Sequence, residues 1–323
     1  MRWGTGRVSP VPGILGHRIR RKPGSTWLHQ TGRGSVRHAL LYRQQRINVN
    51  VTYIQVEAGV TAHLPGWRWI VVNSSGGKDS QAALHYVVGQ CDAQGVPRDR
   101  IVVSHQCLGR MEWPGTLELV RKQAGIYGLR LEVSSYRNKD GAELSLLDYA
   151  RLRKKWPDNK NRWCTSDFKR GPGSRVITKL SRESPGNVLN IFGFRSEESP
   201  ARAKKPVFVK NERLTSNLRE VWDWLPIHHW TEKEVWETIR ASGVPHHPAY
   251  DSGMPRLSCV FCIFAPRAAL LIAGKANPSL LDEYCAVEAE IGHAFKNGKP
   301  ISEIRDALAA GEQPAAVGGE WNM

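Results

Sequence analysis

The sequence predicts an α/β protein with a doubly wound, mostly parallel sheet and a small helical subdomain at its C-terminal end. Short apolar runs rich in β-branched residues alternate with segments of helical periodicity, which is the order of βαβ units. The first run, residues 70–72, leads through Gly76 and Gly77 into a helical segment at 81–88. Ligands of such sheets bind beyond the carboxyl ends of the strands, so we expect the functional residues there.

The later elements follow the same order. We predict strands at 101–105, 129–134 and 188–194, and helices at 117–127, 144–155, 266–276, 278–291 and 301–310. Thr231 and Glu234 form a capping box that predicts the start of a further helix, which runs to Ser242. The chain is therefore divided into a basic N-terminal arm (1–66), an α/β domain (67–230) and a helical subdomain (231–323).

The composition is that of a water-soluble protein of one or two domains. The chain has 323 residues, 41% of them hydrophobic, and no apolar run approaches the roughly 18–20 residues of a membrane span. Six cysteines are too few for a disulfide scaffold in a chain of this length. The first residues lack an apolar signal segment. We therefore expect a cytoplasmic protein without a membrane partner, whose paired cysteines bind metal or take part in catalysis.

The formal net charge of +16 is unevenly distributed. Residues 1–66 contain ten Lys and Arg residues and one acidic residue, Glu57, in a segment without periodicity. Two interpretations stay open for this arm: a disordered leader, or a basic arm that contacts nucleic acid. Residues 51–60 can add an edge strand.

The turn after the first strand has the composition of a phosphate-binding loop. Gly76 and Gly77 allow the main chain to approach a phosphate and to adopt positive φ. Lys78 supplies a positive charge, Asp79 a magnesium ligand, and Ser80 stands where a helix N-cap is expected. The predicted nucleotide-binding residues of this loop are Ser75, Gly76, Gly77, Lys78, Asp79 and Ser80.

The stretch SGGKDS resembles the SGGxDS loop of the PP-loop, or N-type ATP pyrophosphatase, superfamily. Within that superfamily the chain is similar to the PAPS-reductase-like family of adenine nucleotide alpha hydrolases from about residue 69 to 304. After the second strand, residues 107–116 resemble the family pattern DxGxExPxT, with Cys107 at the aspartate position; we expect a buried apolar thiol there. Residues 193–202 resemble GIRxxES..R, which makes Arg195 a candidate phosphate clamp.

The cysteines carry a second resemblance. Residues 163–172 are similar to the CCxxRKxxP segment of iron–sulfur APS reductases, with Trp163 replacing the first cysteine and Cys164 retaining the second. Lys169 in this segment can hold a phosphate or sulfonate oxygen. Cys259 and Cys262 form a later CxxC. The resemblance therefore implies three metal ligands: Cys164, Cys259 and Cys262.

Three states of these thiols are compatible with the sequence. One is a [4Fe–4S] cluster whose fourth iron position is open to sulfide. A second is Zn²⁺ completed by His246 or His247, and the third possibility is that the thiols are reduced and free. Cys285 is either a fourth ligand or a core residue.

The resemblance implies an enzyme, a transferase or an oxidoreductase, that binds ATP or PAPS/APS with Mg²⁺. The complete SGGKDS loop, and the lack of an ECGxH-type segment after Cys285, favour adenylation of an acceptor coupled to sulfur transfer from a sulfur donor. Lys78, Asp79 and Arg195 are the predicted catalytic residues. Two alternatives are an adenylyl sulfate or phosphoadenylyl sulfate reductase, and a non-catalytic nucleotide-binding regulator that acts with a ParB-like partner.

Overall fold

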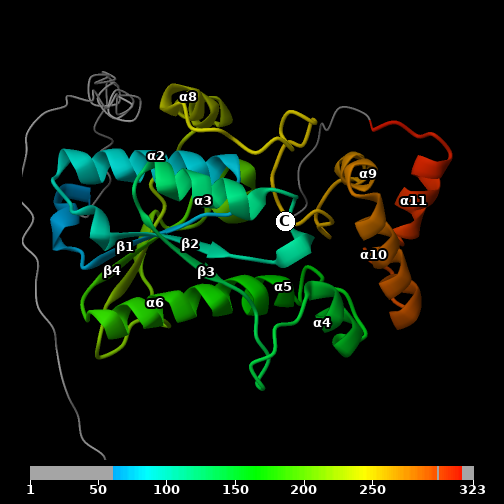
Figure 1. Cartoon of the computed structure of the whole chain (residues 1–323), viewed down its shortest axis with the longest axis horizontal. Coiled ribbons are helices and arrows are strands. Elements are labelled where there is room, and N and C mark those ends of the chain that lie inside the picture. Colours follow the sequence, from blue (N-terminus) through cyan, green and yellow to red (C-terminus); the bar gives the residue numbers. More distant parts are fainter. Residues whose placement is uncertain (1–60, 297, 315–323) are drawn as a thin grey trace, which may run out of the picture. The chain divides into compact units, whose positions relative to one another are not determined.

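A six-stranded sheet with the strand order β3-β2-β1-β4-β6-β5 organises the structure (Figure 1). Neighbouring strands are parallel, except that β5 pairs antiparallel with β6. The strands are β1 (Trp69–Asn73), β2 (Ile101–Gln106), β3 (Arg130–Ser134), β4 (Val188–Ile191), β5 (Phe208–Lys210) and β6 (Val221–Trp224). The predicted doubly wound, mostly parallel α/β fold is confirmed. Strand order reverses between β1 and β4, and this switch point is where such sheets bind ligands.

The computed structural model describes residues 61–296 and 298–314, all of which belong to one compact unit. Residues 1–60, which include most of the predicted arm and its edge strand, lie outside the described residues. The arm was predicted to extend to residue 66, but Thr61–Gly66 form a 3₁₀ helix, η1. Its Leu64 is buried against the sheet core, so residues 61–66 pack with the α/β domain.

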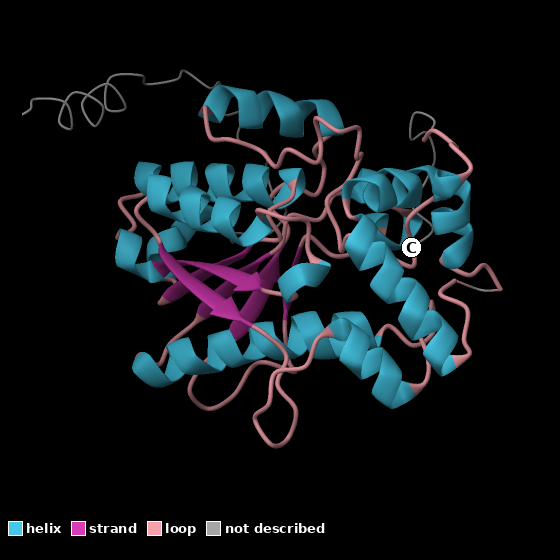
Figure 2. Cartoon of the chain, turned by 45° about the vertical axis from the view of Figure 1, so that its right-hand side comes forward, coloured by secondary structure: helices cyan, strands magenta, loops and turns pink. Residues whose placement is uncertain are grey.

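Helices cover both faces of the sheet (Figures 1 and 2). Helices α2 and α3 lie on one face, and α6 lies on the other. The helices are α2 (Lys78–Ala93), α3 (Thr116–Ile126), α4 (Leu146–Arg153), α5 (Trp163–Thr165), α6 (Gly171–Glu183), α7 (Pro200–Ala203), α8 (Glu232–Ser242), α9 (Arg267–Ala276), α10 (Pro278–Ile291) and α11 (Ser302–Ala309).

Strand β1 shows why the central strands are apolar throughout. Side chains alternate across a strand, so Val72 packs with Leu84 of α2 on one face, and Val71 packs with Leu180 of α6 on the other. Both faces are buried, which leaves no polar position to produce an alternating pattern. The apolar run in the sequence therefore identified β1 correctly.

Five of the named helices and strands were not predicted: α5, α6, α7, β5 and β6. Helix α6 begins with GPGS, a sequence typical of a turn, but Pro172 occupies the first turn of the helix, where its missing N–H costs nothing. Strands β5 and β6 are short, and β6 includes a charged residue, Asp223. The predicted fourth strand extended to residue 194, whereas β4 ends at Ile191.

The C-terminal helices divide differently from the prediction. The capping box at Thr231 is confirmed, and α8 begins there. Helix α8 packs through Val235 and Ile239 on Ala82 and Ala83 of α2, so it belongs with the α/β layers. By contrast, α9, α10 and α11 pack on one another and on α4. The predicted helical subdomain was given as 231–323, and within the described residues this packing group starts at α9.

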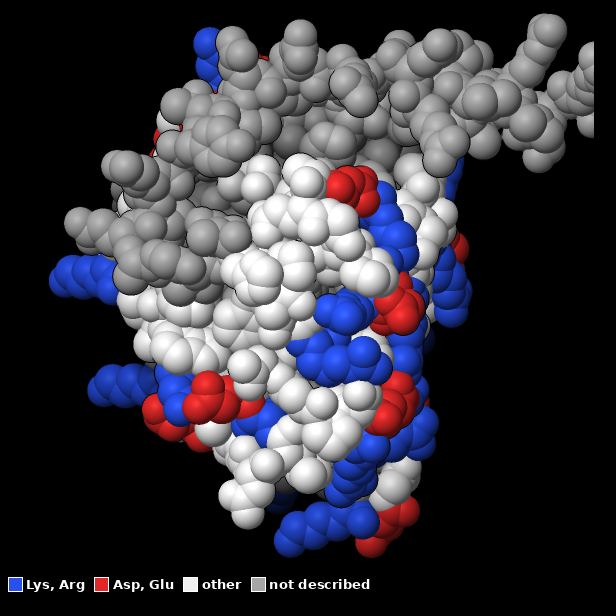
Figure 3. All heavy atoms as spheres, turned by 90° about the vertical axis from the view of Figure 1, so that its left-hand side faces the viewer, with Lys and Arg blue, Asp and Glu red and all other residues white. Residues whose placement is uncertain are grey.

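The charges of the described surface are mixed. On the face shown in Figure 3, basic and acidic side chains are interspersed beside uncharged ones. Arg130, for example, pairs with both Glu132 and Glu183, and Lys210 pairs with Glu220. Among the described helices, none combines the length and apolar character needed to cross a membrane. The nucleic-acid partner proposed for the arm stays a prediction.

Candidate functional site

The SGGKDS loop connects β1 to α2 at the switch point of the sheet. Gly76 has φ +72°, and a Cβ atom on it would lie 2.9 Å from Thr116 Cγ2, so this position requires glycine. The N-cap of α2 is Gly77, and Ser80 lies in the first helical turn instead of at the predicted N-cap. Ser80 Oγ accepts a hydrogen bond from the Ser75 N–H (3.2 Å) and donates to the Gly77 carbonyl (2.9 Å). Ser80 therefore closes the loop on itself.

The N-terminus of α2 is covered by a tyrosine. Tyr250 Oη accepts hydrogen bonds from the N–H groups of Lys78 (2.7 Å) and Leu257 (3.3 Å). Gly76 and Gly77 are buried beneath these residues and do not line the cavity described below. Burial raises the pKa of the Tyr250 hydroxyl, which keeps it neutral. A neutral oxygen thus occupies the position at which a helix N-terminus binds an anion.

The three predicted catalytic residues come together at this loop. Arg195, which follows β4, donates from Nε to Asp79 Oδ1 at 2.6 Å. Lys78 Nζ donates to the Pro255 carbonyl at 2.7 Å and lies 3.8 Å from Asp79. The ammonium is also 3.5 Å from a carboxylate oxygen of Glu232, the first residue of α8. The result is a buried charge network made by segments that are far apart in the sequence.

Arg195 is held by acids in this structure. Its guanidinium is 3% exposed and pairs with Asp79 and Glu197. Arg202, which follows it, pairs with Glu198 and lies over the Phe194 ring. Arg195 therefore fixes Asp79 in place here, and its role as a phosphate clamp stays a prediction.

Asp79→Ala is expected to destabilise the fold, although the sequence places Asp79 in a loop where its removal should matter little. Breaking a buried ion pair leaves the partner charge uncompensated, at a cost of roughly 3 kcal/mol; we expect the low end of the usual range because Glu197 still pairs with Arg195. Urea unfolding of the wild type and the variant measures this loss. Asp79→Asn, which retains a hydrogen-bond acceptor, should lose less.

Asp92→Ala is the matched control for this measurement, because Asp92 lies on the same helix. Its carboxylate is 51% exposed and pairs with Arg98 at 2.6 Å. Exposed pairs contribute below about 1 kcal/mol. Equal losses of unfolding free energy for the two alanine variants would show that the Asp79–Arg195 pair is not a stabilising buried contact.

The three predicted ligand cysteines lie in one electrostatic neighbourhood. Burial raises the pKa of the Cys164, Cys259 and Cys262 thiols, and the charges of neighbouring members of the set raise it further. The pKa of Lys169 is raised, chiefly by Cys259 and despite burial, which acts in the opposite direction. Lys169 thus lies near the cysteines, and its role in nucleotide binding stays a prediction.

The three cysteines are not spaced for a single tetrahedral ion in this structure, and the group that they bind stays a prediction. Tetrahedral zinc with Zn–S bonds of about 2.3 Å spaces its sulfurs about 3.8 Å apart. Among the described residues, the group of candidate ligands whose atoms all lie within 4.8 Å of one another is His105, Cys107 and Glu112, and the three cysteines do not form such a group. A cluster holds its thiolates on different irons and so spaces them more widely.

Neither predicted histidine joins the cysteines. His247 Nδ1 accepts from the Ala249 N–H at 3.1 Å, and its Nε2 lies 3.2 Å from Thr116 Oγ1. His246 is partly exposed and pairs with Asp251. The Cys₃His zinc site predicted as an alternative therefore lacks its histidine in this arrangement. Cys285 is buried in the core on α10, which agrees with the core interpretation.

His247 predicts a pH dependence of stability. Burial lowers its pKa below the usual 6.5, so the neutral ring is favoured in the folded chain. Its contribution is complete above about pH 6.5 and is lost as the pH falls through the folded pKa. The free-energy difference between wild type and His247→Gln should therefore shrink from pH 7 to pH 5. His246→Gln is the control, and a pH-independent difference for His247→Gln contradicts the assignment.

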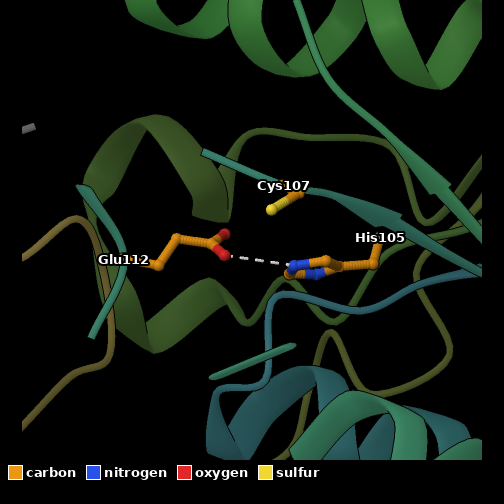
Figure 4. Close-up of side chains that lie close together, drawn as sticks. All are labelled: His105, Cys107 and Glu112. Carbon is orange, nitrogen blue, oxygen red and sulfur yellow. Dashed lines mark hydrogen bonds and ion pairs between the residues drawn. The ribbon is translucent and has the colours of Figure 1, made fainter. Parts of the chain in front are cut away.

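A second cluster lies at the carboxyl end of β2 (Figure 4). Figure 4 shows His105, Cys107 and Glu112 gathered around one space. His105 Nε2 is 3.2 Å from Glu112 Oε2, and its Nδ1 is 2.9 Å from the Ser74 carbonyl oxygen. Burial lowers the pKa of His105, but hydrogen bonds to Cys107 and Glu112 and the charge of Glu112 raise it to about 10. Cys107 is half-buried and polar in its contacts, so the expectation of a buried apolar thiol was wrong.

Cys107 and Glu112 also line a cavity of about 580 Å³. Its walls come from two segments around residues 107–118 and 276–283, and include Gly109 and Arg110 of the 3₁₀ turn Gly109–Met111. Glu112 forms an isolated β-bridge with Cys259. Main-chain contacts thus link the edge of this cavity to the CxxC segment.

Sequence reasoning did not identify His105, Glu112, Tyr250 or Glu232 as site residues. His105 and Glu112 had a usable signal, because they follow a buried parallel strand, where such sheets place their ligands. Tyr250 and Glu232 had none, since only the folded chain brings α8 and the segment before the CxxC onto the loop.

The switch-point loop and the parallel sheet define the class of protein: an α/β protein of the adenine nucleotide alpha hydrolase-like, PP-loop type. Within this class the chain belongs to the phosphoadenosine phosphosulfate reductase domain family, whose model matches residues 69–265. The match ends just after the CxxC, so it includes the loop, Arg195 and all three cysteines.

Curated relatives match a part of the chain. The chain is 30% identical over 122 residues to adenosine 5'-phosphosulfate reductase of Bacillus mycoides, which covers 37% of this chain and 47% of that protein. It is 29% identical over 124 residues to an uncharacterised 37.8 kDa protein of Escherichia phage 186, covering 38% of this chain and 36% of the relative. The chain thus spans about a third to a half of the length of these relatives.

Solved structures give more distant likenesses. Phosphoadenylyl-sulfate reductase from Candida auris, in a phosphate complex, aligns with a TM-score of 0.41 and 20% identity over 62% of this chain and 84% of that one. A U34-tRNA thiolase from Methanococcus maripaludis with its [4Fe-4S] cluster aligns with a TM-score of 0.36 and 12% identity over 78% and 76%.

Proposed function

We propose that the protein is an ATP pyrophosphatase-type enzyme that adenylates an acceptor and couples this step to sulfur transfer. The observation that carries the proposal is the buried contact of Arg195 with Asp79, beside Lys78, at the switch point of the sheet. The contact brings the cations of Arg195 and Lys78 and the carboxylate of Asp79 to the N-terminus of α2. A helix N-terminus is where the phosphates of a nucleotide commonly bind.

The loop supplies binding and charge stabilisation. The pyrophosphate of ATP would lie against the loop of residues 75–80. Tyr250 Oη already accepts from two backbone N–H groups, so nucleotide binding exchanges one oxygen acceptor for another. An acceptor oxygen attacks the α-phosphorus, the bond to the bridging oxygen breaks, and pyrophosphate leaves. Lys78 stabilises the charge that develops on the leaving phosphates.

Magnesium fits the same site. Asp79 is the carboxylate of the loop, and carboxylate oxygens are ligands that Mg²⁺ prefers. Arg195 holds one oxygen of Asp79 at 2.6 Å and thereby orients the second oxygen. The bound ion would neutralise part of the negative charge of the phosphates.

The cysteines support the sulfur-transfer half of the proposal. Cys164, Cys259 and Cys262 are the donor set for a [4Fe–4S] cluster, and the Lys169 ammonium balances thiolate charge beside them. Trp163, which replaces the first cysteine of the family pair, is buried against Tyr149. A three-cysteine cluster leaves one iron without a protein ligand, and that position would supply a binding place for sulfide.

Analysis of the reaction products tests the proposed adenylation. Full-length protein purified without oxygen is incubated with Mg–ATP and sulfide, and the nucleotide products are separated. The proposal expects one pyrophosphate for each ATP consumed, with the adenylyl group recovered on an acceptor or, where sulfide or water displaces it, as AMP. ADP with inorganic phosphate would contradict it, because that pair reports attack at the γ-phosphorus.

A reductase is the second candidate, and the names of the curated relatives favour it. Several of them, including the Bacillus mycoides protein, are named adenosine 5'-phosphosulfate reductase. Thioredoxin-dependent release of sulfite from adenylyl sulfate, without pyrophosphate release from ATP, would support this candidate over adenylation. A ParB-like partner and a sulfur donor stay predictions.

A further inference from the structure

Three side chains outside the SGGKDS loop and the cysteine set converge at the end of β2. They are His105, Cys107 and Glu112, whose ligand atoms all lie within 4.8 Å of one another. Imidazole, thiolate and carboxylate are the three zinc ligand types in proteins. The 3₁₀ turn after Leu108 reverses the chain and brings Glu112 back onto His105.

The separations suit a tetrahedral ion. Bonds of about 2.0–2.3 Å to nitrogen, oxygen and sulfur space the ligand atoms about 3.3–3.8 Å apart. His105 Nε2 and Glu112 Oε2 are 3.2 Å apart, already close to this spacing. A small movement of the Cys107 side chain, which is half-buried, completes the set.

The surroundings orient two of these ligands. A carbonyl oxygen only accepts hydrogen bonds, so the contact to Ser74 places a proton on His105 Nδ1 and directs Nε2 toward Glu112. The Gly109 N–H donates to Cys107 Sγ at 3.3 Å, which stabilises a thiolate. Gly109 reaches this position with φ +60°, which glycine adopts without strain. Such outer contacts are typical of metal ligands.

The same contacts disfavour a reactive thiol. In a Cys–His pair oriented by a carboxylate, one ring nitrogen faces the thiol and the other faces the carboxylate. Here Nδ1 is engaged by the Ser74 carbonyl, so only Nε2 is directed toward Glu112 and Cys107. The nitrogen, sulfur and carboxylate oxygen all lie within 4.8 Å of one another, as an ion bound between them requires.

We propose that His105, Cys107 and Glu112 bind a zinc-class divalent ion with one open coordination position. His105 is 1% exposed and lies on the buried side of the cluster, whereas Cys107 and Glu112 line the cavity of about 580 Å³. The fourth position therefore faces the cavity and takes water or a donor atom of a ligand bound there. Three protein ligands with an open fourth position are typical of catalytic zinc. The ion would displace the proton on His105 Nε2; one thiolate and one carboxylate then offset the 2+ charge, and the neutral imidazole supplies the third donor atom.

Zinc protection of Cys107 tests this site apart from the nucleotide chemistry. The full chain is titrated with ZnCl₂, treated briefly with a thiol-alkylating reagent and digested, and modification of each cysteine is measured by mass spectrometry. Cys107 should be alkylated without zinc, because it lines the cavity, and protected with one equivalent of zinc. Alkylation of Cys164, Cys259 and Cys262 is measured separately in the same spectra.

Glu112→Gln and His105→Gln should weaken this protection at least about 100-fold in zinc concentration, since loss of an outer contact alone typically costs 10–100-fold. Gln123→Ala, a buried polar residue of α3 outside the cluster, is the control and should leave the protection unchanged. Circular dichroism verifies that each variant is folded. Glu112→Gln is the less disruptive of the two variants, because Glu112 is only half-buried. Cys107 that stays reactive at saturating zinc, or protection unchanged in a folded Glu112→Gln variant, overturns the proposal.

Discussion

Lys78→Ala is expected to lower the rate of pyrophosphate release from Mg–ATP by about 10²–10³-fold, the usual cost of removing one preorganised charge donor. The ammonium is 4% exposed and lies beside Asp79 and Glu232, so water replaces it poorly. The initial rate of pyrophosphate formation at saturating ATP measures the effect. A fall in rate at unchanged ATP affinity would place the role of Lys78 in the transition state.

Lys233→Ala is the control for this variant. Lys233 lies on α8 one residue after Glu232, and its side chain is 82% exposed. Its ammonium lies 3.8 Å from a carboxylate oxygen of Glu237. The rate of Lys233→Ala should match the wild type. If Lys78→Ala also retains the wild-type rate, the catalytic role of the SGGKDS loop is wrong.

Cys262→Ser is expected to abolish the iron–sulfur content of anaerobically purified protein. A cluster with three protein ligands holds about four irons per chain, and a site left with two thiolates retains less than about one. Cys262 is half-buried, so its replacement by the near-isosteric serine disturbs packing little. Iron and acid-labile sulfide analysis measures the loss, together with the visible absorbance of the preparation.

Cys285→Ala is the control because it separates the two interpretations of that residue. Cys285 lies on α10, and after burial the main influences on its pKa are Arg305 and Glu288, not the other cysteines. It should retain the full iron content. If the wild-type protein contains no iron, the proposed cluster is wrong. If the wild type contains iron and Cys285→Ala does not, Cys285 is a ligand.

Local patterns were sufficient for the core of the fold. The run at 70–72 is apolar on both faces because β1 is covered by α2 and α6, so a central strand could be identified without its partners. Thr231 caps α8 through contacts within four residues, which is why this start was predicted correctly. Helix α6 was missed because its amphipathic stripe follows a turn-like GPGS sequence.

The candidate site was only partly predictable. The SGGKDS sequence identified the loop, and Arg195 was found on the adjacent strand end, yet its partner Asp79 was assigned to a loop tip. The contacts of Tyr250 with Lys78 span 172 residues, and no local pattern encodes such a contact. The proximity of Lys169 to the cysteines was likewise not predicted, because a lysine in a sequence pattern indicates charge and not position.

The amino-acid sequence by itself determined the family, the alternation of strands and helices, and the glycine loop, because each depends on residues that are neighbours along the chain. Tertiary structure alone decided that Arg195 is paired with Asp79, that Lys169 lies with the cysteines, and that His105 meets Cys107 and Glu112 at a cavity wall. The physical reason is that charge pairing and ligand geometry depend on distance in space, and parallel strands with crossover helices bring distant segments to one edge of the sheet.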